Sequence, residues 1–467
     1  MSSSTRIEHD LLGDREIPAD AYWGIHTLRA IENFPITGRK IGSYPELIRA
    51  IALVKRAAAR ANEQLGHLDT RLADAIAAAC VDIEAGQLHD QFAVDVIQGG
   101  AGTSTNMNAN EVIANLALEK LGLTKGDYKA LSPLNHVNMA QSTNDVYPTT
   151  LKLAIVFGIQ ILLDAMHELQ AAFEAKAGEF SDVLKMGRTQ LQDAVPMTLG
   201  QEFMTYAVMM GEDIARLQEA TALIQEVNLG ATAIGTGINT DIRYARMATE
   251  LLSEFSGVKL IPAHNLIEAT QDTGSFVQLS GVLKRIACKL SKVCNDLRLL
   301  SSGPQGGLNE INLPERAAGS SIMPGKVNPI IPEVVNQIAF EVIGNDVTIT
   351  MASEGGQLQL NAFEPIIGHS LFKSIEHLAA GCRTLTENCV KGITANRELL
   401  AERVRCSAGL ATALNPHIGY ENATWAAREA LRSGRSVAEL VLERGLMTQA
   451  ALDEALRPEV LTAPRAL

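Results

Sequence analysis

The sequence predicts an all-α fold, and three observations lead to that prediction. Apolar residues recur at helical spacing over several segments of roughly 20 to 30 residues. Alanine and leucine are abundant, whereas aromatic residues make up only 4% of the 467 residues, a composition that favours helix over sheet. The sequence lacks alternating strand patterns, βαβ spacing and any short fixed repeat. We therefore expect a helical frame whose loops carry the chemistry.

Residues 1–140 are predicted to form a mostly helical N-terminal domain. Residues 1–45 look like loop, because prolines interrupt them and no helical spacing is present. Helices are expected over Glu46–Gly66 and Arg71–Gly86, where apolar residues recur at the right spacing. A third helix should follow the stretch QGGAGTSTNMNANE and run to about Leu121.

Residues 141–395 are predicted to form a central bundle of five long helices. The first, Leu151–Phe180, would be ~45 Å long at 1.5 Å per residue, with Pro148 in its first turn. Its first half is apolar on nearly every side, so other helices must surround it. The other four segments are Thr198–Val227, Ser275–Ser301, Glu333–Met351 and Phe363–Gly392. The pattern predicts an elongated bundle that packs against the bundles of other subunits.

Residues 396–467 change to shorter helices punctuated by prolines, which predicts a small C-terminal helical domain. Two sequence patterns predict where helices begin. Thr198 with Gln201, and Ser436 with Glu439, have the spacing of a capping box, in which each residue's side chain caps the other's backbone N–H.

Composition and charge exclude several classes of protein. The net charge of −13 argues against nucleic acid as the main partner, since phosphate binding needs a basic surface. The apolar run Leu151–Leu163 contains Lys152 and Gln160 and is too short to cross a bilayer. The N-terminus lacks the apolar segment of an export signal. Six cysteines without zinc spacing are expected to be reduced and buried. We expect a soluble cytoplasmic protein with no membrane partner.

The most informative stretch is Gly319–Pro329, which reads GSSIMPGKVNP. It lies in a long segment, residues 301–332, without helical or strand periodicity. Loops of this length are usually functional or disordered, and the scattered apolar residues make disorder a poor fit. We interpret the stretch as an ordered, mobile loop, called the signature loop below.

Three other clusters share the composition of the signature loop. They are Gly102-Thr103-Ser104, Gln141-Ser142-Thr143-Asn144 and Gly187-Arg188-Thr189-Gln190. Taken singly, each is more often a helix cap or turn than a site. Four such clusters beside long helices raise the chance that they converge. Hydroxyl, amide and backbone N–H donors around one lysine, Lys326, are what a small dicarboxylate needs.

Other interpretations of these motifs fail on spacing. Gly319 and Gly325-Lys326 resemble a phosphate-binding loop, but five residues separate the glycines where four are required, and Val327 replaces the Ser or Thr that binds magnesium. Gly235-Thr236-Gly237 lacks the third glycine of a dinucleotide fingerprint. The histidines have no metal-binding spacing, so no metal site is predicted.

The sequence resembles a known family over essentially its whole length. GSSIMPGKVNP is similar to the signature of the fumarase/aspartase superfamily, and so are the stretches GGAGTSTNMNANEVIAN, HVNMAQSTND, MGRTQLQDAVPMTLGQEF and NDLRLLSSGPQGGLNEINLPE. The resemblance implies an all-helical homotetramer whose active sites each draw on three subunits. Thr143 and Gln190, and the residue that follows Thr103, resemble the superfamily's ammonia-lyases rather than its class II fumarases. The implied reaction is the reversible deamination of L-aspartate to fumarate and ammonia.

The resemblance also implies a role for each matching residue. Ser320 would be the general base that removes a proton from the carbon next to the β-carboxylate. Thr103, Ser142, Thr143 and Ser321 would bind the β-carboxylate as it takes up the charge of an enediolate. Thr189, Lys326 and Asn328 would hold the α-carboxylate. Asn144 and Gln190 would contact the departing amino group; some relatives have His in place of Gln190.

The implied chemistry is physically reasonable and needs no cofactor. Backbone N–H groups of the tight Gly-Ser-Ser turn and the lysine charge can stabilise a serine alkoxide. Donors aimed at the β-carboxylate would bind the charged intermediate better than the substrate. Two alternatives remain open at this stage: a class II fumarate hydratase, and a non-catalytic member of the superfamily that acts as a binding or structural protein.

Overall fold

The computed structural model describes residues 4–319 and 321–464. The chain divides into two compact units. Unit 1 comprises Met1–Leu163, Ala215–Arg285 and Phe340–Leu378, and unit 2 comprises Asp164–Ile214, Ile286–Ala339 and Ala379–Leu467. Each unit is described by itself below. The predicted division at residues 140 and 395 stays a prediction.

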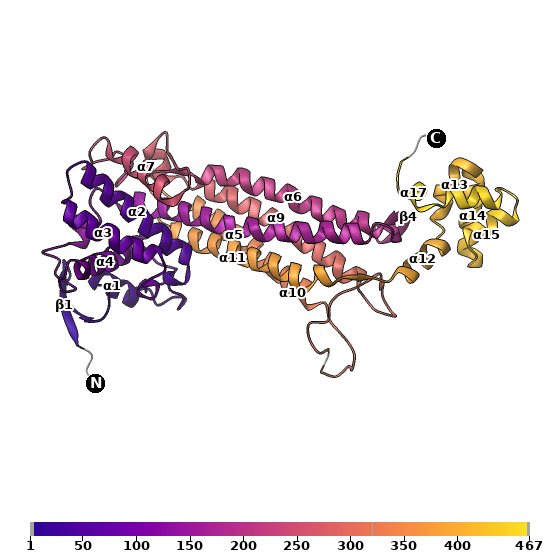
Figure 1. Cartoon of the computed structure of the whole chain (residues 1–467), viewed down its shortest axis with the longest axis horizontal. Helices are drawn as coiled ribbons and strands as arrows, with labels where there is room; N and C mark the ends of the chain where they lie inside the picture. The colour runs from indigo at the N-terminus through magenta and orange to yellow at the C-terminus, as the bar shows by residue number, and fades with distance from the viewer. Residues whose placement is uncertain (1–3, 320, 465–467) are drawn as a thin grey trace. The chain divides into compact units, whose positions relative to one another are not determined.

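The all-α prediction is confirmed, and the described residues contain five helices of at least 25 residues, all labelled in Figure 1. They are α5 (Thr143–Glu179), α6 (Leu199–Ile224), α9 (Gly274–Leu300), α10 (Ile330–Glu354) and α11 (Glu364–Asn388). They correspond to the five predicted segments, with ends that differ by up to eight residues. Each unit contains part of all five helices.

In unit 1 the helix segments are joined by buried polar contacts and by close packing. Ser280 of α9 donates a hydrogen bond to Asp346 of α10 (2.8 Å). Asn345 of α10 donates to Ser374 of α11 (3.0 Å). A Cβ added to Gly368 of α11 would lie 2.7 Å from a terminal methyl of Leu151 on α5, so the two helices pack closely at this crossing.

In unit 2 the same helices pack through aromatic and amide side chains. Phe173 of α5 contacts Phe203 and Tyr206 of α6, with ring centroids 6.3 and 5.5 Å away. Asn336 of α10 donates to the hydroxyl of Ser291 on α9 (2.8 Å). Both segments of the bundle are therefore fixed by specific contacts as well as by apolar burial.

The shorter helices lie at the two ends of the sequence and between the long ones. Unit 1 contains α1 (Ile25–Asn33), α2 (Pro45–Gln64), α3 (Thr70–Glu84), α4 (Thr103–Lys120), α7 (Tyr244–Ser256) and α8 (Leu266–Gln271). Unit 2 contains α12 (Arg397–Cys406), α13 (Leu410–Ile418), α14 (Tyr420–Ser433), α15 (Val437–Glu443), α16 (Gln449–Ala455) and α17 (Pro458–Leu461). Both predicted capping boxes are present, at the start of α6 and of α15.

Although the sequence shows no strand pattern, short strands are present. Four two-stranded sheets occur among the described residues. They pair β1 (Thr5–Asp10) with β2 (Gly13–Pro18), β3 (Leu184–Thr189) with β4 (Gln192–Thr198), β5 (Glu226–Val227) with β6 (Ile261–Pro262), and β7 (Ile311–Asn312) with β8 (Thr394–Ala395). The strands are short, and the turns of the two hairpins are Leu11-Leu12 and Gln190-Leu191, which lack the usual Asn-Gly signal. Residues 1–45 are therefore not all loop, since they hold β1, β2 and α1.

The position predicted for Pro148 was also wrong, because α5 begins earlier than expected. The helix starts at Thr143, so Pro148 lies inside it. Proline has no N–H, and the carbonyl of Asn144 therefore lacks its usual helical donor. The side chain of Asn228 replaces that donor, with its Nδ2 3.0 Å from the Asn144 oxygen.

Helix α5 is longer than the apolar run seen in the sequence. Among the described residues it is the one helix long and apolar enough to cross a membrane, and 78% of its most apolar 18-residue window is buried within the protein. The core helix of a soluble protein has the same properties.

All six cysteines are free, as predicted. Four of them are buried, whereas Cys288 and Cys406 are exposed, so the prediction of general burial was wrong for those two.

Candidate functional site

The residues predicted to form the site fall into both units. Thr103 and the segment Ser142–Asn144 belong to unit 1, whereas Thr189, Gln190 and the signature loop belong to unit 2. Ser320, the predicted base, lies outside the described residues. The structure brings the first group together within unit 1 and does not place it relative to the second.

In unit 1 the candidate residues gather where two helices begin. Thr103 is the first residue of α4, and Thr143 is the first residue of α5. The N-cap residue Gly102 has φ +91°, and a Cβ there would lie 2.3 Å from the Tyr147 ring of α5. Only glycine permits this approach of the two helix starts. Backbone N–H groups at helix N-termini attract anions, which suits a carboxylate ligand.

The hydroxyls of this group can donate to an anion. The Ser142 hydroxyl oxygen accepts from the Asn144 N–H (3.2 Å), and that of Thr143 accepts from the Asn106 side chain (3.1 Å). A hydroxyl that accepts in this way keeps its own hydrogen for another acceptor. Thr103 differs, because its hydroxyl donates to the Gly100 carbonyl (2.7 Å) and must rotate before it can bind a carboxylate.

Asn144 is held by its side chain as well as by its backbone. Its Nδ2 donates to the carbonyl oxygen of Ala233 (2.7 Å). Asn228 binds the Asn144 carbonyl and also donates to the hydroxyl of Thr270 on α8 (3.1 Å). The segment Asn228–Ala233, which follows β5, therefore forms one wall of this part of the site.

A buried lysine and a buried aspartate hold the residues at the start of the segment Ser142–Asn144. Neither was predicted from the sequence. Lys55 of α2 donates to Asn138 (3.0 Å) and Gln141 (2.8 Å), the latter just before Ser142. Asp145 accepts from the Ser142 N–H (3.0 Å). Burial lowers the pKa of Lys55 to about 7 and raises the pKa of Asp145 to about 7. Their opposite charges each favour the ionised form of the other. Two features of the sequence could have pointed to them. Lys55 is the one lysine of its helix, and Asp145 is the last residue of the motif QSTND.

In unit 2, Thr189 and Gln190 lie at the tip of the hairpin formed by β3 and β4. Thr189 pairs with Gln192, so the loop contains only Gln190 and Leu191. Both have positive φ, 53° and 63°. A two-residue loop with two positive φ angles is the type I′ turn that usually contains Asn and Gly. Non-glycine residues in this conformation store strain, which often occurs at functional sites.

A buried carboxylate, Glu310, ties this hairpin to the segment that precedes the signature loop. It forms ion pairs with Lys185 (2.9 Å) and Arg188 (2.6 Å) of β3, and it lies 3.6 Å from Arg403 of α12. A buried carboxylate is costly unless cations or hydrogen-bond donors compensate its charge. Nothing in the sequence marks Glu310 as important, because only the fold brings these basic residues around it.

Gly319 and Lys326, two residues of the signature loop, lie close together. A Cβ added to Gly319 would lie 1.5 Å from the carbonyl oxygen of Lys326, so only glycine fits beside that carbonyl. The side chains of Ser321, Lys326 and Asn328 are exposed. Lys326 and Asn328 line a cavity of about 560 Å³ together with Arg298. A single chain thus presents these groups in an open, solvent-accessible hollow.

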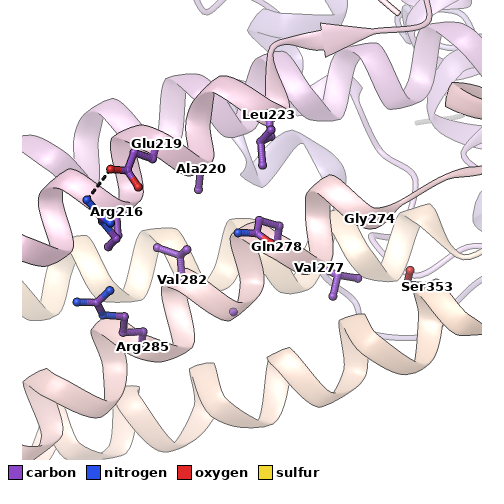
Figure 2. Close-up of a pocket in the computed structure, with 11 residues that line it drawn as sticks. Arg216, Glu219, Ala220, Leu223, Gly274, Val277, Gln278, Val282, Arg285 and Ser353 are labelled. Atoms are coloured by element: carbon purple, nitrogen blue, oxygen red, sulfur yellow. Dashed lines mark ion pairs between the residues drawn. The ribbon is translucent and has the colours of Figure 1, made fainter. Parts of the chain in front are cut away.

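A larger cavity in unit 1, about 770 Å³, has a different character. Figure 2 shows it between α6, α9 and α10, with Leu223, Val277 and Val282 in its lining and an ion pair between Arg216 and Glu219. None of the predicted site residues lines it. It lacks the convergent hydroxyl donors of the candidate site, and we assign no catalytic role to it. Among the described residues, no group of three or more His, Cys, Asp or Glu side chains could hold a metal ion.

Comparisons with known proteins identify the family of the chain. A family model described as "Lyase" matches residues 13–344, and one described as "Fumarase C C-terminus" matches residues 410–463. The chain is 61% identical over 464 residues to an aspartate ammonia-lyase of Pseudomonas aeruginosa, covering 99% of this chain and 98% of that protein. It is 55% identical over 465 residues to an aspartate ammonia-lyase of Escherichia coli (strain K12), covering 99% and 97%.

Solved structures give the same result. A fumarate lyase:delta crystallin from Brucella melitensis, bound to cobalt, matches with a TM-score of 0.97 and 55% identity over 99% of this chain and 100% of that one. A class II fumarase from Schistosoma mansoni matches with a TM-score of 0.92 and 33% identity, over 97% of this chain and 98% of that one. Sequence and fold therefore agree over nearly the whole length, and the chain belongs to the lyase family that these aspartate ammonia-lyases and class II fumarases represent.

Proposed function

We propose that this protein is an ammonia-lyase that converts L-aspartate reversibly to fumarate and ammonia. The observation that carries the proposal is the similarity of 55–61% over nearly the full chain to aspartate ammonia-lyases. The polar groups in unit 1 support it, since Ser142 and Thr143 offer hydroxyl hydrogens to a carboxylate and Asn144 offers an amide to an amino group.

The proposed reaction begins with removal of a proton. Ser320, as an alkoxide, takes the proton from the carbon next to the β-carboxylate, and the electron pair of that C–H bond moves onto the carboxylate. Thr103, Ser142, Thr143 and Ser321 bind the resulting enediolate. Donors fixed in advance at the place where charge develops stabilise the intermediate more than the substrate.

The second step breaks the bond between carbon and nitrogen. The electron pair of the enediolate forms the double bond of fumarate, and the protonated amino group (–NH₃⁺) takes the electron pair of the C–N bond and leaves as ammonia. Lys326, Asn328 and Thr189 hold the α-carboxylate, while Asn144 and Gln190 contact the departing nitrogen. Closure of the signature loop would exclude water during these steps. The proposed reaction uses no cofactor. That no cofactor is needed stays a prediction.

We further propose a cytoplasmic homotetramer in which three subunits contribute to each active site. Large apolar side chains exposed on the long helices support an assembly. On α10, Phe340, Val347 and Met351 are 63%, 56% and 69% exposed and recur at helical spacing along one face. A contiguous apolar helix face of this kind usually marks an interface.

The function is tested by following fumarate through its ultraviolet absorbance. The purified protein is given L-aspartate, and in a separate assay L-malate. Fumarate should form from L-aspartate. Formation from L-malate alone would identify a fumarate hydratase instead. If neither compound is converted, the protein is a binding or structural member of the family.

A further inference from the structure

The orientation of the Asn144 side-chain amide is determined by its neighbour. Its contact with the Ala233 carbonyl oxygen measures 2.7 Å. A carbonyl oxygen only accepts hydrogen bonds, so the amide must turn its NH₂ group toward Ala233. The other branch of the amide, the oxygen Oδ1, can only accept. An acceptor is what an ammonium group requires, whereas a carboxylate would require a donor.

The Ala233 carbonyl is placed by the preceding residues, which Asp145 holds. The Asp145 oxygen Oδ2 accepts from the backbone N–H groups of Gly230 (3.1 Å) and Thr232 (2.9 Å). Its other oxygen, Oδ1, accepts from the N–H of Ser142 (3.0 Å). The Asp145 carboxylate therefore links two sides of the site. One oxygen binds the backbone of Ser142, and the other binds the backbone of Gly230 and Thr232.

The segment held in this way is strained and tightly packed. Thr232 has φ +57°, an uncommon conformation for a β-branched residue. Gly230 has φ +92°, and a Cβ there would lie 2.5 Å from the Cβ of Ala245 on α7. Strained backbone persists only where surrounding contacts enforce it, and here the two hydrogen bonds to Asp145 provide that enforcement.

Asp145 is fully buried, and two other titratable groups lie within electrostatic range of it. The ammonium group of Lys55 on α2 favours its ionised form, and the hydroxyl of Tyr244 on α7 lies within electrostatic range. Since Lys55 also donates to Gln141, the charge of Asp145 is balanced by a group that is itself tied to the binding segment.

We infer that Asp145 is a positioning residue for recognition of the substrate amine. Through the N–H groups of Gly230 and Thr232 it fixes the Ala233 carbonyl, which turns the Asn144 amide so that Oδ1 accepts a hydrogen bond from the ammonium group of an amino dicarboxylate. This inference rests on the proposed function, in which Asn144 contacts the amino group, and it adds the device that orients that contact.

The test is a double-mutant cycle of Asp145→Asn and Asn144→Ala, measured as kcat/KM for L-aspartate. An asparagine at position 145 has one acceptor oxygen, so it cannot serve both sides of the site. We expect Asp145→Asn to lower kcat/KM by about 10–100-fold. Because Asp145 acts on the amine through Asn144, the loss in the double variant should be clearly smaller than the product of the two single losses. Losses that multiply in the double variant, or no loss in Asp145→Asn, would overturn the inference.

A second variant, Gly230→Ala, perturbs the wall segment without touching Ser142. Its Cβ displaces the segment that carries the Ala233 carbonyl, and the KM for L-aspartate should rise at least about tenfold. The inhibition constant of succinate, a dicarboxylate without an amine, should stay within about threefold of wild type. Equal weakening of both ligands would indicate general damage to the site and would contradict the inference. This variant also keeps the inference testable if Asp145→Asn fails to fold.

Glu364→Gln provides the matched control. Glu364 is a second buried carboxyl of unit 1, and burial raises its pKa to about 8, so it is largely uncharged at pH 7. Replacing it with an amide should leave kcat/KM close to wild type. The wild-type assay is run first. A wild-type protein that does not convert L-aspartate refutes the proposed function, whereas additive losses in an active enzyme refute only the role of Asp145.

Discussion

At the scale of single residues, the site combines groups that the sequence marked with groups that it did not. The hydroxyl and amide residues of the motif QSTND were recognisable, because donors of this kind suit a dicarboxylate. Lys55 and Asp145 were not, since their roles depend on the residues that burial places beside them. A lysine in a helix is usually solvated, and only the tertiary structure shows that this one is buried.

The first prediction concerns the proposed base. Ser320→Ala should lower kcat by about 10²–10⁴-fold, the usual contribution of a positioned acid or base, and leave folding and assembly intact. Steady-state kinetics with L-aspartate, together with size-exclusion chromatography, measure both properties. Near-normal turnover in a correctly assembled variant would show that another group removes the proton.

The second prediction concerns the pH dependence of stability. Burial raises the pKa of Glu364 from its ordinary value of 4.5 to about 8. Its neutral form is therefore favoured in the folded state, and the resulting stability is fully present below about pH 4.5 and is lost as the pH rises toward 8. A glutamine cannot ionise, so Glu364→Gln should lose less stability between pH 5 and 8, by about 1–3 kcal/mol.

Denaturation midpoints at fixed protein concentration, measured for both proteins at the two pH values, test this prediction. The charge that acts on Glu364 is that of Lys152, and burial lowers the pKa of this lysine. If wild type and Glu364→Gln show the same change in midpoint between pH 5 and 8, Glu364 is ionised in the folded protein throughout this range.

At the scale of elements, the long helices were predictable and the hairpins were not. The five long segments are recognisable by their helical periodicity. The capping box of Thr198 with Gln201 marks the start of one of them, α6. The hairpin that carries Thr189 has no such signal, because its turn contains Gln190 and Leu191 in conformations that these residues rarely adopt. Tertiary contacts of Arg188 and Lys185 with Glu310 compensate for that local cost.

The third prediction follows from the strained turn. Leu191 is 69% exposed and has φ +63°, so its side chain contributes strain without burial. Leu191→Gly should stabilise the protein by about 0.5 kcal/mol, because glycine adopts positive φ without steric cost. Thermal or chemical denaturation measures this effect.

Leu12 provides the matched control for the turn. It is 79% exposed in the turn between β1 and β2, and it is not among the described residues with positive φ. Leu12→Gly should be neutral or destabilising, since glycine there only adds freedom to the unfolded chain. Destabilisation by Leu191→Gly would instead indicate that the exposed Leu191 side chain packs against another subunit.

At the scale of the whole molecule, the proposed site is divided between the two units of one chain. Ser142 and Thr143 lie in unit 1, and Thr189 and Lys326 lie in unit 2. The exposed apolar face of α10 supports the proposal of an assembly in which other subunits complete each active site.

The fourth prediction tests shared active sites by complementation. Thr143→Val and Ser320→Ala should each be nearly inactive as pure proteins. When the two are unfolded together and reassembled, about a quarter of the sites should receive both wild-type residues if Thr143 and Ser320 come from different subunits. Activity near that fraction of wild type is expected. A mixture as inactive as its components would show that both residues of a site come from one chain.

The sequence by itself determined the helical class, the five long helices and the chemical character of the loops, because each depends on local periodicity or on residue type. The tertiary structure alone decided which distant residues contact those loops and hold them in place. It buries Lys55 and Asp145 beneath Ser142, encloses Glu310 among cations, and turns the Asn144 amide toward Ala233. These arrangements join residues distant in sequence, and their energies come from burial and hydrogen bonding that exist only once the chain has folded.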